Sequence, residues 1–362
     1  MSAQITADVN QPPTLTWNHL NINRTHLEAS VAAAAVAEIS GTGAAVSLRH
    51  CAPGVADTHL PLIEGGLGKD FDGQFDAAVR QLGVPLCEFS VAAGAAADTP
   101  VRVSFNAAAG SASVADTLIR AGAGSSSTFV FDFSSQKDAS GMFGSRILLQ
   151  AEEGASVNIV TVNMLGSGFV HFDSVAADAA AGARLSLTQL ELGASQVFSG
   201  SRVGLRGDGS RFDGRLGYMV KEDHSLDVNY VALQEGRSTA STMTADGVVA
   251  DSAKKTWRGT IDFRKGCAES SGDEQENVLL LSPAVVNKAL PVILCDEESV
   301  EGRHGASVGR LSQDILFYMQ SRGISEKDAE RLMVRAKIAG VCRYIPDEKL
   351  VASVQEFLGG AL

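Results

Sequence analysis

Cysteine, glutamate and histidine side chains gather in one short stretch near residue 300. Cys295 is followed by the acidic run Asp296–Glu298, then by Glu301 and by His304. Thiolate, carboxylate and imidazole groups together offer the soft and hard ligands that iron accepts. The alternative is a solvated acidic turn, in which Cys295 belongs to the core and His304 bonds a backbone carbonyl. The residue types alone favour this alternative.

Two other groups could carry chemistry, but each has a simpler structural interpretation. The stretch Lys254–Phe263 combines lysines with Trp257, as nucleic-acid-binding surfaces do, yet an edge strand with solvated lysines and a buried tryptophan explains it better. His224 lies beside Asp223 and close to Asp227. Adjacent strand residues point to opposite faces, so a polar turn is favoured over an acid–base or metal group. No nucleophile elbow, phosphate-binding loop, HExxH or dinucleotide motif occurs, so we predict no enzymatic activity.

Composition and charge limit the kinds of partner. The 362-residue chain has 42 acidic and 30 basic residues, and its net charge of −12 argues against broad binding to nucleic acid. Hydrophobic residues make up 45% of the chain, enough for a sizeable core, and the length allows two or three structural units. Aromatic residues reach only 6%, whereas there are 37 glycines. This combination favours many tight turns around a core of small and branched side chains.

Neither a membrane span nor a secretion signal is recognisable in the sequence. No apolar run approaches the roughly 18 residues that cross a bilayer, and the N-terminal residues lack a basic stretch followed by an apolar one. The five cysteines are scattered without a CxxC pair, which argues against a disulfide framework or a zinc finger. We therefore expect a cytoplasmic protein with reduced thiols and no membrane contact.

A repeat of 27 to 30 residues runs through the middle of the chain. It is marked by glycines at turn-like positions: Gly94, Gly124, Gly154, Gly182, Gly209, Gly236 and Gly266. Behind two of these glycines the apolar residues recur at the same offsets, as Val157, Ile159, Val162 and Met164 and as Leu185, Leu187, Leu190 and Leu192. Period-two alternation with a slip of one residue predicts two short strands separated by a corner. The repeat favours a β-helix solenoid, and a β-sandwich is the alternative.

Helices are expected at both ends of the chain. The alanine-rich stretch Ala29–Ile39 allows one helix, and Asp76–Leu82 predicts a short second one. Near the C-terminus, Ser312, Ser325 and Pro346 each begin a predicted helix. The buried faces are predicted as Ala329, Leu332, Met333 and Ala336 in the second of these and Leu350, Val351, Val354, Phe357 and Leu358 in the third. Such helices could cap the solenoid or present a docking surface.

Several segments together resemble one family. The segments are KKTWRGTIDFRKG (Lys254–Gly266), GDEQENVLLLS (Gly272–Ser282), and LPVILCDEE, VEGRHGASVG and LFYMQSRGI within Leu290–Ile324. They resemble the SufB/SufD family of iron–sulfur cluster assembly proteins. The segment LTWNHLNIN (Leu15–Asn23) is similar to the opening of shorter SufD-like members. The similarity is dense over the last 110 or so residues and loose over the middle of the chain.

The resemblance implies a mainly β protein with a right-handed parallel β-helix core and a C-terminal α-helical domain. The expected parts are a mixed, partly helical N-terminal segment (1–85), the β-helix core (86–305) and the helical domain (306–362). The resemblance also implies that the helical domain binds the ABC-type ATPase SufC, whose closure distorts a SufB–SufD pair where the nascent cluster is built. The docking candidates are Leu316, Phe317, Tyr318, Arg322 and Gly323, for which packing on the solenoid is the alternative role.

The resemblance reverses the interpretation of His304, which matches a SufD histidine at the SufB–SufD interface. His304, Cys295 and Glu298 become candidates for the cluster-assembly interface, and His304 also becomes a candidate metal ligand. Gly305 stands where SufB has a glutamate, and no cysteine lies in the LLLS strand (279–282), so the chain is SufD-like. Two other ligands of the family pattern are missing here. Gly302 replaces a cysteine often found in SufD, and the segment 231–234 lacks a histidine.

We therefore predict a SufD-like, non-catalytic subunit that binds a SufC-type ATPase and pairs with a SufB-like subunit through the β-helix. No intrinsic cofactor is expected, beyond a transient iron–sulfur cluster at a subunit interface. One alternative is a homodimeric scaffold that works with SufC alone. The other is a β-helix enzyme acting on polysaccharide, against which the two tryptophans, four tyrosines and lack of a secretion signal argue.

Overall fold

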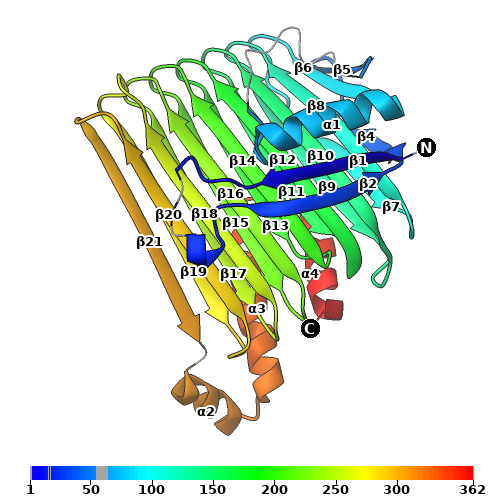
Figure 1. The fold of residues 1–362 in the computed structure, drawn as a ribbon, viewed down its shortest axis with the longest axis vertical. Helices are drawn as coiled ribbons and strands as arrows, with labels where there is room; N and C mark the ends of the chain where they lie inside the picture. The colour runs from blue at the N-terminus through cyan, green and yellow to red at the C-terminus, as the bar shows by residue number, and fades with distance from the viewer. Residues whose placement is uncertain (1, 15, 17, 54–63, 311, 362) are drawn as a thin grey trace.

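The computed structural model describes residues 2–14, 16, 18–53, 64–310 and 312–361. Leu15 and Trp17, which belong to the SufD-like opening segment, lie outside the described residues. From Leu86 onward the chain winds as a solenoid whose strands alternate between two facing sheets (Figure 1). The predicted parallel β-helix is confirmed, because strands two apart in sequence pair in parallel within each sheet.

The first sheet holds the even-numbered strands of the solenoid. Its main path, in spatial order, is β20 (Val286–Cys295), β18 (Lys254–Phe263), β16 (Ser225–Gln234), β14 (Gln196–Leu205), β12 (Gly168–Ala179), β10 (Ser140–Ala151), β8 (Ala112–Ala121), β6 (Leu86–Val91) and β5 (Val46–Cys51). The short strand β3 (Ala33–Ala34) pairs with β8 beside this path. Only β5 joins the path antiparallel, on β6.

The second sheet holds the odd-numbered strands. Its order is β21 (Val300–Arg310), β19 (Ser270–Leu280), β17 (Ala240–Val249), β15 (Arg211–Val220), β13 (Arg184–Glu191), β11 (Ser156–Met164), β9 (Ser126–Ser135), β7 (Val101–Ala107) and β4 (Ala37–Ser40), with β4 antiparallel to β7. The last strand continues to Arg310, beyond residue 305 where the core was expected to end. The side chains between the two sheets form the main hydrophobic core.

The repeated glycines lie at the turns between the coils, for two different reasons. Gly154 and Gly182 have φ of +67° and +65°, which side chains other than glycine rarely tolerate. At Gly236, a Cβ atom would lie 2.5 Å from the backbone of Gly207 in the neighbouring coil. The repeat in the sequence therefore reflects both left-handed turns and the close stacking of successive turns.

The predicted corner inside each repeat is wrong. β11 and β13 are uninterrupted strands. Val157 and Ile159 point into the core between the sheets, whereas Val162 and Met164 lie in a second cluster on the outer face beneath the C-terminal helices. The strand itself is regular. The apolar pattern shifts by one residue because the buried apolar side chains move from one face of the strand to the other.

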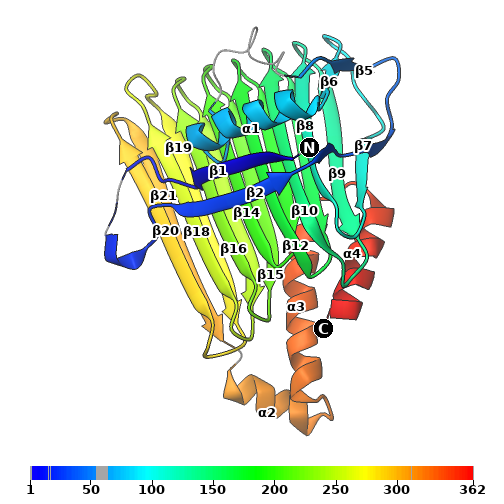
Figure 2. The same ribbon diagram turned by 45° about the vertical axis from the view of Figure 1, so that its right-hand side comes forward.

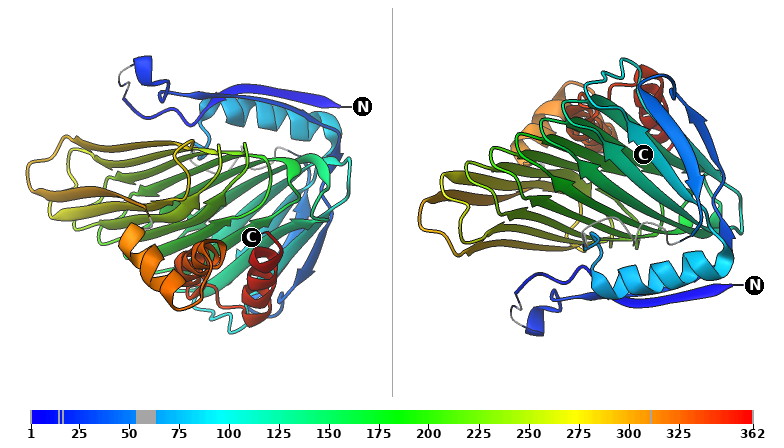
Figure 3. Two further views of the ribbon diagram at one scale, coloured as in Figure 1. Left: turned by 90° about the horizontal axis from the view of Figure 1, so that it is seen from below. Right: turned by 90° about the horizontal axis from the view of Figure 1, so that it is seen from above.

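The N-terminal residues cover the outer face of the first sheet. The hairpin of β1 (Ala3–Val9) and β2 (Thr25–Val31) and the helix α1 (Lys69–Leu82) lie on this face, where Phe71 packs against Phe172 (Figure 3). The helix expected over Ala29–Ile39 is wrong, since β2, β3 and β4 occupy this stretch. In β2 the buried residues alternate with exposed ones, which is the period of a strand. The predicted helix at Asp76 exists but already begins at Lys69.

The C-terminal helices lie on the side opposite to α1 (Figures 2 and 3). They are α2 (Gln313–Ser321), α3 (Glu326–Cys342) and α4 (Glu348–Ala361). A short 3-10 helix, η1 (Asn18–Leu20), lies between β1 and β2 in the N-terminal part of the chain. The predicted caps are confirmed, because the hydroxyls of Ser312 and Ser325 accept hydrogen bonds from the first turns of α2 and α3. None of the described helices is long and apolar enough to cross a membrane.

The buried face of α3 differs from the predicted stripe. Ala329 is buried as expected, but Leu332 is 48% exposed. The residues of α3 that are buried instead are Val334, Ile338, Val341 and Cys342, which pack on the second sheet together with Leu350, Val354 and Leu358 of α4. Both faces of α3 carry apolar residues, so only the position of the sheet decides which face is covered.

Candidate functional site

The last coil of the solenoid, formed by β20 and β21, ends both sheets. Among the described residues, no further strand pairs with either of them. The residues of β21 are almost all exposed, whereas those of β18 in the preceding coil are mostly buried. We call this last coil, residues 286–310, the open end.

The space between the two sheets is the lumen of the solenoid. His304 is one of the β21 residues on the side of the strand that faces this lumen. It pairs in register with Glu274 of β19, whose side chain is buried between the sheets. His304 itself is exposed, because no further coil covers it. The imidazole is therefore accessible on the last coil of the solenoid.

Cys295 and Glu298 lie at the turn that connects β20 to β21. Cys295 is exposed, and its thiol donates a hydrogen bond to the Glu297 carbonyl at 3.1 Å. The Glu297 carboxylate accepts from the Gly266 amide at 2.9 Å, and this backbone hydrogen bond lowers the pKa of Glu297. The interpretation of Cys295 as a core residue is therefore wrong. In the described part of the chain, Cys295, Glu298 and His304 do not form a set of three ligand atoms close enough to share one ion.

Directly beneath His304, the lumen is polar and acidic. The Trp257 indole donates to Glu274 at 2.8 Å, and Lys255 forms an ion pair with Glu276. Burial raises the pKa of Glu274 to about 7. Gly259 makes room for this acid, because a Cβ atom there would lie 1.9 Å from the Glu274 carboxylate.

The sequence analysis missed these luminal residues. β18 is an interior strand, so the prediction of an edge strand with solvated lysines is wrong for Lys255, although Trp257 is buried as expected. A signal was present, because Glu274 and Glu276 share the period-two phase of the buried Val278. That phase places both acids on the inner face.

The docking candidates occupy two environments on α2. Leu316 is only 7% exposed and lines a small depression with Leu280 and Leu281. Phe317 and Tyr318 are 74% and 60% exposed. The Arg322 guanidinium lies 5.4 Å from the centre of the Tyr318 ring, and Gly323 ends this segment with a φ of +83°. The helix therefore packs through Leu316 and presents an aromatic, basic surface to solvent, as the protruding position of α2 in Figure 2 allows.

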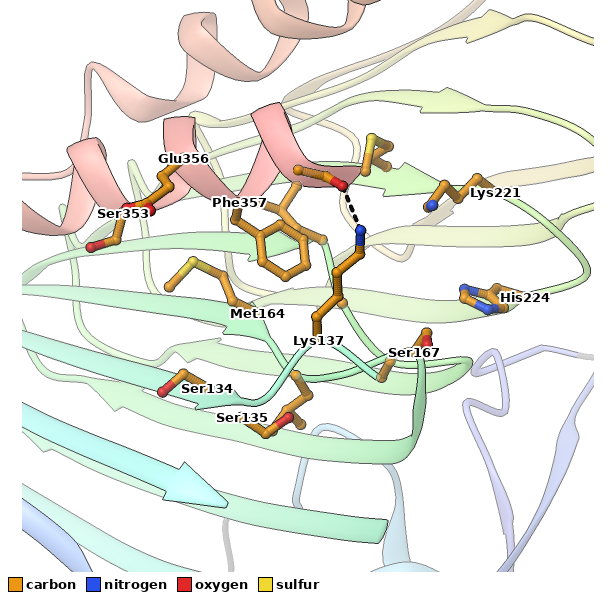
Figure 4. Close-up of a pocket in the computed structure, with 16 residues that line it drawn as sticks. Ser134, Ser135, Lys137, Met164, Ser167, Lys221, His224, Ser353, Glu356 and Phe357 are labelled. Carbon is orange, nitrogen blue, oxygen red and sulfur yellow. Dashed lines mark hydrogen bonds between the residues drawn. The ribbon is translucent and has the colours of Figure 1, made fainter. Parts of the chain in front are cut away.

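A cleft of about 440 Å³ lies between α4 and the ends of the second sheet (Figure 4). Met164, Met219 and Phe357 make it apolar, and Lys137 ties α4 to a turn by donating to the Gly360 carbonyl at 2.7 Å. His224 lies at its rim within the turn between β15 and β16, which confirms the polar turn.

The acids predicted near His224 do not join it in a site. His224 lies 3.4 Å from Glu222. The Asp227 carboxylate faces the outer surface of the first sheet, where it pairs with Arg258 at 2.7 Å and accepts from Thr25 at 2.6 Å. This pair anchors the N-terminal hairpin to the solenoid.

A family model described as the SufBD core domain of the SUF system for Fe–S cluster assembly matches residues 104–337. The chain belongs to the SufB/SufD family of iron–sulfur cluster assembly proteins. The match runs from β7 to the middle of α3 and so includes the open end and α2.

Relatives named SufD place the chain on the SufD-like side of the family. SufD of Bacillus subtilis is 29% identical over 199 residues, which cover 54% of this chain and 45% of that protein. SufD of Escherichia coli is 24% identical over 243 residues, or 66% of this chain and 56% of that protein. A SufBD family protein of Mycobacterium tuberculosis is 23% identical over 194 residues, or 54% and 23%. The chain thus spans about half the length of the SufD relatives it matches.

Proposed function

We propose that this chain is a non-catalytic SufD-like subunit of an iron–sulfur cluster assembly complex. It pairs through the open end with a SufB-like subunit and binds a SufC-type ATPase through α2. A cluster passes the interface as transient cargo. The proposal places the protein in the cytoplasm, in agreement with its five free cysteines.

The observation that carries the pairing is the unprotected state of the open end. β20 and β21 are 10 and 11 residues long, and each lacks a neighbour on one side within the described structure. Val286 and Val308 are exposed there. Long edge strands with exposed apolar side chains readily add a strand from another chain, and soluble proteins usually protect them. A partner that continues both sheets would bury these residues.

The exposed surface of α2 supports ATPase docking. The rings of Phe317 and Tyr318 are largely exposed, and aromatic and arginine side chains are the groups enriched at binding hot spots. Arg322 lies beside Tyr318. Because Leu316 packs α2 against the solenoid, a conformational change of the bound ATPase would be transmitted to the open end through α2 and β21.

The test is reconstitution with the SufB-like subunit and the SufC-type ATPase from the same genome. Native mass spectrometry should find one copy of this chain beside one SufB-like subunit, together with the ATPase. F317S/Y318S should weaken ATPase binding about tenfold or more. V36S, which changes another highly exposed apolar residue outside α2, should not. An assembly of two copies of this chain with the ATPase, and no place for the SufB-like subunit, would contradict the pairing and favour the homodimeric scaffold.

His304 has its own test in the same reconstitution. His304→Ala should leave the complex intact and lower the yield of assembled cluster, because the imidazole faces the interface. Arg303→Ala is the matched control, since Arg303 is the strand neighbour on the opposite face and is also exposed. An unchanged cluster yield in H304A would remove His304 from the ligand set.

A further inference from the structure

A second polar cluster lies deep in the solenoid, several coils away from the open end. His171 and Asp173 project inward from β12, and Glu191 projects inward from β13 in the facing sheet. The three residues are between 0% and 3% exposed. One potential ligand atom from each lies within 4.8 Å of the other two. The cluster therefore joins the two sheets across the lumen.

Two polar atoms of this cluster are buried without a partner. His171 Nε2 and Asp173 Oδ1 have no hydrogen-bond partner within the described part of the chain. Such groups are rare in folded proteins, because an unsatisfied buried polar atom costs about 1–3 kcal/mol. Both atoms belong to residues of the cluster, and each is free to accept a further bond inside the lumen.

The opposite atom of each side chain is already held. His171 Nδ1 lies 3.0 Å from the Phe143 carbonyl, so Nδ1–H donates and Nε2 presents its lone pair. Asp173 accepts from Gln189 at 2.7 Å, and Glu191 accepts from Asn163 at 2.9 Å. Outer hydrogen bonds that orient one imidazole and two carboxylates are the usual second shell of a metal centre.

The charge of the cluster also lacks compensation. Within the described residues, no lysine or arginine forms an ion pair with Asp173 or with Glu191. The acids beneath the open end differ, because Glu276 there has Lys255 as its partner. A buried dication would balance two carboxylates.

We propose that His171, Asp173 and Glu191 bind one divalent first-row transition-metal ion that clamps the two sheets together. A nitrogen ligand with two carboxylates suits Zn²⁺, Mn²⁺, Fe²⁺ or Co²⁺ better than Mg²⁺ or Ca²⁺, which take oxygen ligands. Metal–ligand bonds of about 2.0–2.2 Å require the three atoms to approach one another further when the ion binds. The ion would be a structural one, distinct from cluster cargo, and it revises the expectation that the chain has no intrinsic cofactor.

The test is metal retention by the full-length folded chain. The chain is produced in medium supplemented with Zn²⁺ or with Co²⁺ and treated with EDTA while folded, and bound metal is measured by mass spectrometry. We expect about one ion per chain to survive, and the Co²⁺ form to show visible ligand-field absorption. D173N and E191Q should each lower retained metal at least tenfold.

Glu274→Gln is the matched control, because it neutralises another buried luminal acid outside the cluster. It should retain the ion. Circular dichroism of each variant verifies folding, and the metal content of the unmodified chain decides the question if a variant does not fold. Less than about a tenth of an ion per chain after growth in either metal would overturn the proposal and assign the cluster to two carboxyls that share a proton. Equal loss of metal in E274Q would also overturn it.

Discussion

The two ends of the solenoid are built differently. At the N-terminal end, β4 and β5 are short, with 4 and 6 residues, and they pair antiparallel with the solenoid. The lumen there is filled by phenylalanine rings whose centres lie 5.2–5.6 Å apart. At the C-terminal end, the strands are long and no further strand covers them within the described residues. The lumen there contains the buried residues Lys255, Glu274 and Glu276, and His304 is exposed on the last coil.

This difference assigns separate tasks to the two ends. Short edge strands protect a sheet from unwanted pairing, whereas long exposed edges invite it. Aromatic packing stabilises without offering chemistry, whereas buried acids and amines cost stability unless they are paired. The N-terminal end thus stabilises the solenoid, and the C-terminal end carries the groups that would meet a partner in the proposed complex.

The largest effect is expected in the aromatic half. Phe129→Ala should lower the free energy of unfolding by about 4 kcal/mol, because the Phe129 ring is fully buried with its centre 5.4 Å from that of Phe89. Urea unfolding of the isolated chain measures this change. Phe317→Ala, which removes an exposed ring, should change it by less than about 0.5 kcal/mol. Similar losses in both variants would contradict the assignment of stability to the N-terminal half.

A somewhat smaller loss is expected from breaking the buried ion pair in the polar half. Lys255→Met should cost about 3 kcal/mol, because Glu276 stays buried without its partner. The double variant K255M/E276M should recover most of this loss in the same urea experiment. If the double variant were less stable than the single one, the pair would not be the cause.

The polar half should also make stability depend on pH. Burial raises the pKa of Glu274 from 4.5 to about 7, so the folded chain holds this proton where the unfolded chain has lost it. Stability contributed by the proton is complete below about pH 4.5 and is lost as pH rises towards about 7. With about 1.4 kcal/mol for each pKa unit, the loss reaches at most about 3 kcal/mol.

Glu274→Gln should reduce the difference between the free energies of unfolding at about pH 4.5 and about pH 7, measured by urea unfolding. Glu153→Gln changes an exposed acid and should leave the pH dependence of the unfolding free energy unchanged. A slope of equal size in E274Q and in the unmodified chain would show that other groups cause it.

The smallest free-energy effect concerns association. Val308→Asp at the open end should weaken binding of the SufB-like subunit by about 30-fold, or about 2 kcal/mol. Val36→Asp, at an exposed valine beside β4, should leave the affinity unchanged. Titration of the labelled SufB-like subunit with each variant measures the two affinities. Equal weakening by the two variants would remove the distinction between the ends.

Much of the fold was predictable from local signals. The glycine repeat follows from stacked turns that only glycine fits, and Ser312 and Ser325 begin helices because their hydroxyls satisfy free amide groups. The family followed from several motifs taken together. The exposed position of His304 agrees with an interface residue, but its role stays a prediction.

The errors have one physical origin, since a sequence shows periodicity but not which face is covered. Val162 and Met164 seemed to shift phase because α4 covers the outer face of β11. The cluster of His171, Asp173 and Glu191 was also invisible, because it needs the register of two facing sheets. Tertiary packing creates these relations, and short-range spacing does not encode them.

Hydrogen–deuterium exchange of this chain, alone and with the SufB-like subunit, tests the central claim most directly. We predict that peptides covering Val286–Cys295 and Val300–Arg310 exchange more slowly in the complex, because their free edge amides gain partners. Peptides covering β4 and β5 should exchange at the same rate in both states. Protection at β4 and β5, or none at β20 and β21, would contradict the account.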